Sequence, residues 1–355
     1  MMIFIIMHRI PPCFRQETWI KTSGRTKPGM SEKCNFPEIK LARGMAILLV
    51  VLGSALPKQA SISDGECIYF LHTLCGSFPM ALFFILAGFA AYSSLLSKTR
   101  IRTQLTQYTH RLLIPYAVYS ALTAALSFAF SDSADQKTDT GLLRKILLGE
   151  EFGGLWFPLT LFIVSVSFLL LTKRSRHPAF LLVCGGLLYV LYIFFPDLIL
   201  SQVFQYSLFY AVGIWLREDY ARAQRSLKSK KLILISLFLL LVMTLFSNIT
   251  PLNYPITVLL GSMAVLGSAI LLSKAPERKF SRFFGELGNY SYDIYLFNCF
   301  IQIAADRIFS AMPGTPEPVI VLATFVSGLA IPYLLSKYLI HRSVWLSRLF
   351  TGECN

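Results

Sequence analysis

Charged residues are scarce in this chain. Only 15% of its 355 residues are Asp, Glu, Lys or Arg, whereas 55% are hydrophobic, and the mean hydropathy is +0.58. These values exclude an ordinary soluble domain, in which about a quarter of the residues are charged. The sequence also lacks a Gly-x-Ser-x-Gly elbow, a phosphate-binding loop, a zincin motif and paired catalytic carboxylates, so it points to none of the enzyme classes built on these motifs.

Cysteine and histidine are few as well, with seven and five residues respectively. Because there is no Cys-x-x-Cys pair and no other metal-like spacing, we predict no metal site. Most cysteines are expected to be free thiols. The alternative is a disulfide between Cys67 and Cys75, which both lie near the predicted outer face. His8, His177 and His341 are expected to lie in tails and loops.

Acidic residues are fewer than basic residues. There are 19 of them against 33, which gives a net charge of +14. A nucleic-acid partner is not expected, because no recognition fold or stacking motif accompanies the excess. Most of the lysines and arginines fall in loops on one side of the predicted spans, as the positive-inside rule and anionic headgroups explain. The predicted partner is therefore the lipid bilayer, with both termini cytoplasmic.

Long apolar runs are what the sequence has in abundance. They come in blocks of about 17–25 residues, long enough to cross a hydrocarbon core as helices. Alternating barrel strands are absent, so helices are the expected spanning form. We predict an all-α polytopic protein of the plasma (inner) membrane with about ten transmembrane helices. The predicted spans are 42–57, 74–96, 112–130, 155–172, 179–195, 199–216, 232–247, 256–273, 290–310 and 319–340.

Domain organisation is simple. Residues 1–40 are predicted to be a basic cytoplasmic tail, in which Met30 would also be a sensible start. Residues 41–345 form the transmembrane domain, and residues 346–355 a second cytoplasmic tail. Inverted repeats and helices broken at mid-membrane would indicate a secondary transporter, and neither is evident.

Five segments, in chain order, resemble motifs of the acyltransferase-3 family of integral membrane acyltransferases. The likeness covers about residues 41–350 and is nearest to the sugar O-acetyltransferase branch that includes the intercellular-adhesin modification proteins. The segments are Leu41–Gly53 for the first helix, Phe78–Phe89 for the second, Arg111–Tyr116 for the third, Leu155–Phe157 for the fourth and Leu287–Asn298 for the ninth.

This resemblance implies transfer of an acyl group, expected to be acetyl, from acyl-CoA to a hydroxyl of a cell-surface glycan or lipid-linked sugar. It also implies that Arg43 and Arg111 meet the phosphates of CoA, which a planar guanidinium suits well. Either arginine is equally explained as an anchor at the cytoplasmic edge of its span. Eleven helical steps place Arg43 and position 54 on one helix face, ~16 Å apart.

At three positions where the resemblance leads us to expect histidine, this chain has Ser54, Pro79 and Asn298. A histidine at position 54 would act as the base on the acceptor hydroxyl. Serine is too weak a base for that role. Ser54 is either a nucleophile beside an activating group or a small residue for close helix packing. Asn298 either takes part in catalysis or forms a hydrogen bond to another helix.

Asp293 and His72 are the first candidates for a replacement base. A carboxylate inside a membrane is a functional candidate by default, but Asp293 near a helix start also favours the helix dipole. His72, at the outer mouth, is either a base or merely solvated. Trp156 belongs either to an interfacial aromatic belt or to a platform on which a sugar stacks.

The replaced histidines favour a second hypothesis. In it, the chain is a catalytically silent family member that binds or exports a glycan, or supports a partner enzyme.

Overall fold

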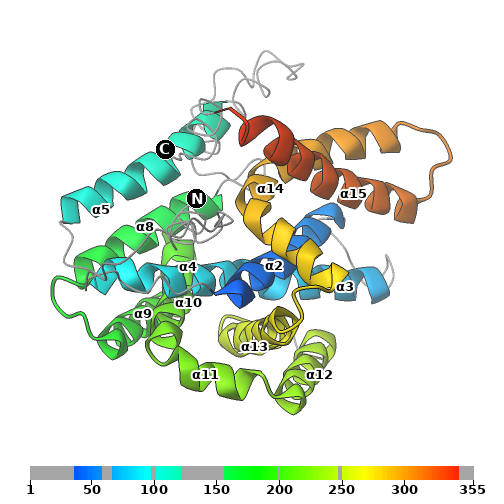
Figure 1. Cartoon of the computed structure of the whole chain (residues 1–355). Coiled ribbons are helices and arrows are strands. Elements are labelled where there is room, and N and C mark those ends of the chain that lie inside the picture. The colour runs from blue at the N-terminus through cyan, green and yellow to red at the C-terminus, as the bar shows by residue number, and fades with distance from the viewer. Residues whose placement is uncertain are drawn as a thin grey trace, which may run out of the picture.

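The structure, a computed structural model, describes residues 36–57, 66–96, 101–121, 156–198, 200–246 and 250–343. Within that part of the chain every secondary-structure element is a helix (Figure 1), as predicted. Both predicted tails lie largely outside the described residues, so their boundaries stay predictions. The helices are α2 (Pro37–Ala55), α3 (Glu66–Ser77), α4 (Pro79–Leu96), α5 (Ile101–Tyr108), η2 (Thr109–Leu113), α8 (Trp156–Leu171), α9 (Pro178–Phe194), α10 (Ser201–Glu218), α11 (Tyr220–Leu227), α12 (Lys230–Phe246), α13 (Tyr254–Ser273), α14 (Lys279–Ser310), α15 (Glu317–Leu335) and η4 (Ser336–Ile340).

Three of the described helical segments are long and apolar enough to cross a membrane: Cys67–Leu95, Tyr254–Ser273 and Glu317–Ile340. Two further apolar helices, Trp156–Leu171 and Pro178–Phe194, are shorter. The protein is therefore a helical membrane protein, while the count of ten spans and the side on which the termini lie stay predictions. The first of these segments starts at Cys67 and not at residue 74, so the segment carrying His72 is helical.

Large apolar side chains on the outside of the molecule agree with a lipid environment. Leu187 of α9, Leu234 of α12 and Leu322 of α15 have 64%, 65% and 61% of their surface exposed. In water such faces would favour aggregation, whereas hydrocarbon solvates them as well as a protein core does.

Helix α2 occupies the centre of the bundle and packs against α3, α4, α13, α14 and α15 (Figure 1). Its closest crossing is with α14. A Cβ atom on Gly44 would lie 1.9 Å from the carbonyl oxygen of Phe284, and one on Gly288 would lie 2.0 Å from that of Lys40. The two backbones are therefore in direct contact, as small residues permit in membrane helices.

The two central helices run parallel. Gly44 lies against Gly288 near one end of the contact, and Ser54 bonds Asn298 near the other. Parallel packing is what the predicted topology requires of the first and ninth spans. It also fixes which residues of α14 lie beside which residues of α2 along the two helix axes.

The beginning of α2 is held by α11. The Tyr220 hydroxyl donates a hydrogen bond of 2.6 Å to Glu38 Oε1, and Gln224 Nε2 donates one of 3.1 Å to the same oxygen. Burial, and then the bond to this carboxylate, raise the pKa of Tyr220. The Arg217 guanidinium lies 4.1 Å from the centre of the Phe36 ring, a cation–π contact at the same end.

Candidate functional site

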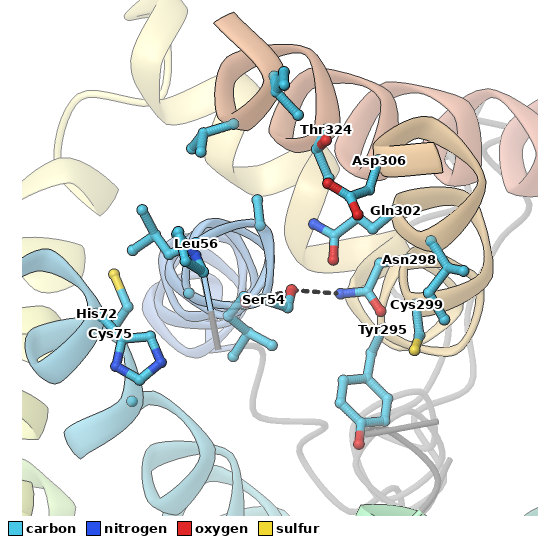
Figure 2. Close-up of a pocket in the computed structure, with 18 of the residues that line it drawn as sticks. Ser54, Leu56, His72, Cys75, Tyr295, Asn298, Cys299, Gln302, Asp306 and Thr324 are labelled. Carbon is cyan, nitrogen blue, oxygen red and sulfur yellow. Dashed lines mark hydrogen bonds between the residues drawn. The ribbon is translucent and has the colours of Figure 1, made fainter. Parts of the chain in front are cut away.

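The described helices enclose a cavity of about 780 Å³ at the end of α2 that carries Ser54 (Figure 2). Its walls come from α2, α3, α14 and the first turns of α15, with Trp156 at the start of α8. This volume is in the range of small-molecule binding sites. Four predicted site residues line it together: Ser54, His72, Trp156 and Asn298.

Ser54 sits in the last turn of α2 and is exposed to the cavity. Its Oγ lies 2.9 Å from the carbonyl oxygen of Val50 and 3.1 Å from that of Val51, so the hydroxyl proton is directed into its own helix. The same oxygen accepts a long hydrogen bond of 3.4 Å from Asn298 Nδ2. Among the described residues no imidazole or carboxylate bonds this hydroxyl, so nothing there activates it as a nucleophile.

Two side-chain amides of α14 form hydrogen bonds to the end of α2. Asn298 donates a hydrogen bond to Ser54. One turn further along, Gln302 Nε2 donates a hydrogen bond of 2.9 Å to the carbonyl oxygen of Val51. Both side chains are 4% exposed. Gln302 is held from behind by α15, because a Cβ on Gly328 would come within 2.5 Å of its Cγ. Gln302 was missed in the sequence, where it is one polar residue in an apolar span.

The remaining walls combine an imidazole, aromatic rings and thiols. His72 and Cys75 face the cavity from α3, and Tyr295 and Cys299 face it from α14 (Figure 2). The expectation of free thiols is confirmed for Cys67 and Cys75, which excludes the alternative of a disulfide between them. The two residues lie eight positions apart on one helix, about 12 Å, which is too far for a disulfide.

Trp156 is half-buried and stacks on Tyr206, with ring centroids 5.3 Å apart and planes 27° apart. It also meets Phe157 edge to face at 6.1 Å. The indole is thus held by α10 while it lines the cavity. A fixed aromatic face of this kind offers stacking area at little cost in side-chain entropy.

Arg43 does not line the cavity. It lies eleven residues before Ser54 on α2, is 6% exposed, and its Nε and one terminal nitrogen make no hydrogen bond with any described residue. A buried guanidinium without a partner is energetically unfavourable, and an anion is the partner that it would best accept. Arg111 is in η2, but its side chain is outside the described part of the structure.

Asp293 also lies away from the cavity. It is 1% exposed, its Oδ2 accepts a hydrogen bond from the Ser336 hydroxyl, and the same oxygen lies 3.0 Å from His341 Nε2, within hydrogen-bond distance. Its Oδ1 bonds no described residue. His341 was expected in a tail, and no spacing in the sequence indicated this contact, because only the packing of α14 against the end of α15 creates it.

The predicted site is therefore divided. Ser54, Asn298, His72 and Trp156 meet at the cavity, whereas Arg43 and Asp293 are buried outside it. No three His, Cys, Asp or Glu side chains come together as metal ligands within the described ranges.

Comparison with known proteins adds a family. The acyltransferase-3 family model, described as an acyltransferase domain, matches residues 36–337. No curated protein and no solved structure matches the chain.

Proposed function

Because the chain belongs to the acyltransferase-3 family, we propose that it is an integral membrane O-acyltransferase. It moves an acyl group, acetyl in our proposal, from acyl-CoA to a hydroxyl of a cell-surface glycan or lipid-linked sugar, as in the sugar O-acetyltransferase branch. The observation that carries the proposal is the alignment on α2 of a buried, incompletely paired arginine with a cavity whose lining on the same helix starts at Val50 and includes Ser54, eleven residues after Arg43.

The donor belongs at the Arg43 end in this proposal. CoA has phosphates at one end and the thioester at the end of a long flexible arm. A phosphate at Arg43 supplies the anion that this guanidinium lacks, and two parallel N–H···O bonds can form. The arm then follows α2 toward Ser54, ~16 Å away. Arg111 is the second predicted phosphate ligand. CoA is cytoplasmic, which agrees with the predicted cytoplasmic position of this end.

The acceptor belongs in the cavity. Trp156 and Tyr295 offer aromatic faces, and the amides of Asn298 and Gln302 offer donors and acceptors for hydroxyl groups. Sugars present apolar C–H faces and a rim of hydroxyls, so this combination suits them. The cavity extends to Asp306 near the end of α14, which is the predicted outer side.

The reaction is a substitution at the thioester carbonyl carbon. The acceptor oxygen attacks, a C–O bond forms, the C–S bond breaks, and the hydroxyl proton ends on the CoA sulfur. Ser54 is not the base, because its own proton is directed to backbone carbonyls.

Transfer from radiolabelled acetyl-CoA in membranes containing the full chain tests this function. The wild type is expected to label glycan or lipid. Arg43→Ala is expected to lose most of the label, while Arg222→Ala keeps it, because Arg222 is an exposed arginine that forms a surface ion pair with Asp219 three residues earlier. Full labelling by Arg43→Ala would contradict the donor site.

The silent-member hypothesis remains the second candidate, and it is favoured because no imidazole or carboxylate of the described residues bonds Ser54. The same assay separates the two hypotheses. Label with Ser54→His but not with the wild type would mark a silenced enzyme with an intact donor site. Loss of label in Ser54→Ala would instead assign the serine a part in transfer. No label in any membrane that contains an acceptor would favour glycan binding or export.

A further inference from the structure

One end of the cavity lies between α14 and α15, and these two helices are antiparallel. Gln302 of α14 lies against Gly328 of α15, where a Cβ would come within 2.5 Å of the glutamine Cγ. Earlier on α14, Asp293 bonds Ser336, which comes later on α15. A step forward along α14 is therefore a step back along α15. The residues one turn from the Gln302–Gly328 contact, toward the connection between the helices, must face each other as well.

Asp306 and Thr324 are the residues at that level. Asp306 follows Gln302 by four positions on α14, and Thr324 precedes Gly328 by four positions on α15. Asp306, Thr324 and Gln302 all line the cavity, and Figure 2 shows them gathered on the side away from His72. A carboxylate, a hydroxyl and an amide thus form one polar wall.

The hydroxyl of this wall has no partner among the described residues. Thr324 is 4% exposed, and its Oγ1 makes no hydrogen bond with any of them. A threonine inside a helix commonly donates to the carbonyl oxygen three or four residues earlier, as Thr244 does to Leu240. Because a buried hydroxyl without a partner is unfavourable, a polar group of a ligand at this wall would satisfy it.

The carboxylate of the wall carries a charge that the rest of the described chain does not neutralise. Asp306 is exposed and forms no hydrogen bond or ion pair with another residue of the described ranges. Arg307, in the last turn of α14, and Glu317, in the first turn of α15, each have the sign of charge that their helix end favours. Asp306 has the opposite sign for its position near the end of α14, so the helix gives no reason for it.

We propose that Asp306, Thr324 and Gln302 bind a protonated amino group of the acceptor, which is therefore a glycan containing an amino sugar with a free amine. This rests on the acyltransferase function proposed above. An ammonium group has three donors and no acceptor. It donates to the Asp306 carboxylate, the Thr324 hydroxyl oxygen and the side-chain oxygen of Gln302, whose amide nitrogen already bonds Val51. Asp306 and Glu317 outnumber Arg307 at this end of the cavity, which favours a cationic ligand over an anionic one.

The amino sugar bound here is not the sugar that receives the acyl group. Asp306 lies eight residues beyond Asn298, which bonds Ser54, and eight helical steps are ~12 Å along the axis. This is longer than one sugar ring, so the ammonium belongs to the ring next to the one whose hydroxyl reaches the level of Ser54. The smallest acceptor that occupies both places is a disaccharide. As an ammonium the nitrogen has no lone pair, so it does not compete with the hydroxyl for the acyl group.

Binding of a glucosamine tetrasaccharide to the full chain in detergent tests the inference, measured by calorimetry against the N-acetylated tetrasaccharide. The wild type should bind the free-amine form about tenfold more tightly, the usual effect of a hydrogen bond to a charged group. The preference should decrease at high salt. Asp306→Asn should abolish it and leave the affinity for the N-acetylated form unchanged. The matched control is Asp197→Asn, an exposed carboxylate between α9 and α10, which should keep the preference.

Thr324→Val separates a binding role from a structural one. Valine has nearly the same shape and removes a buried hydroxyl that has no partner, so the melting temperature should stay the same or rise. The affinity for the free-amine form should nevertheless fall about threefold. Equal binding of the two tetrasaccharides by the wild type, binding of neither, or an unchanged preference in Asp306→Asn would each overturn the inference.

This measurement needs no acyl-CoA, so its result is independent of the transfer assay. Acyl transfer by a wild type that shows no preference for the free amine would overturn the inference and leave the acyltransferase function standing. A preference that depends on Asp306, in a protein that transfers no acyl group to any acceptor, would keep the amine site and contradict the acyltransferase function.

Discussion

The two polar regions along α14 differ in how their groups are satisfied. Around Asn298 and Gln302 the groups are neutral, one of their hydrogen bonds is as long as 3.4 Å, and they face an open cavity. Around Asp293 the carboxyl group is 1% exposed and is held by two partners, Ser336 and His341. Neutral amides can exchange partners with a ligand at little cost in free energy, whereas a buried carboxylate needs fixed partners.

This difference indicates that the two regions of α14 have different roles. The cavity region is suited to a molecule that comes and goes, because breaking the long Asn298–Ser54 bond loses little. The Asp293 region is suited to holding α14 against the end of α15, because its carboxyl group is 1% exposed and contacts Ser336 and His341. A single close-packed crossing, between Gly44 and Gly288, holds both regions in register.

The largest expected effect on stability comes from a substitution that disrupts the contact between α2 and α14. In Gly44→Ala the new Cβ would lie 1.9 Å from a backbone oxygen of α14, so the two helices must separate. We expect a loss of about 3 kcal/mol in the free energy of unfolding, seen as a lower melting temperature in detergent. Acyl transfer should be lost with it.

Gly186→Ala is the matched control for that substitution. Gly186 lies in α9, and no atom comes within 4 Å of the Cβ that alanine would add. Because alanine is the better helix former, this variant should be as stable as the wild type or up to about 1 kcal/mol more stable. Equal melting temperatures for the two variants would show that α2 and α14 do not touch at Gly44.

A smaller effect is expected from Gln302→Ala, which alters the cavity region alone. It removes the 2.9 Å bond to Val51, but Ser54 Oγ can still donate to that carbonyl. The expected loss of stability is therefore about 1 kcal/mol, measured by thermal unfolding. Gln202→Ala, at an exposed position of α10, should change nothing.

The rate–pH profile gives Gln302→Ala its second measurement. If the two regions are separate, the profile should keep its wild-type acid limb even where the rate falls. A displaced acid limb would mean that Gln302 is coupled to the group that titrates during transfer.

The sequence predicted the helical class because apolar blocks and charge asymmetry are properties of the chain itself. For Asn298 it left two roles open, catalysis or a hydrogen bond to another helix, and the structure shows such a bond, from Asn298 to Ser54. It did not predict Gln302 or His341. Their partners lie 251 and 48 residues away, so no local spacing marks them. Arg43 was found by its place in a motif, but its missing hydrogen bonds could be seen only in the packed bundle.

The last comparison of the two regions uses thiol labelling and measures accessibility to a reagent instead of stability. Two single-cysteine proteins are compared in a background whose other cysteines are serine: one keeps Cys299, which lines the cavity, and one carries Ser336→Cys beside Asp293. Ser336 is fully buried, so a cysteine thiol at position 336 should resist a maleimide while Cys299 reacts.

A membrane-impermeant maleimide should reach Cys299 from outside intact cells, because the cavity extends toward the predicted outer end of α14. Reaction at position 336 would show that the region around Asp293 is open to solvent. Labelling of Cys299 only in inverted vesicles would reverse the predicted orientation and place the acceptor on the same side as CoA.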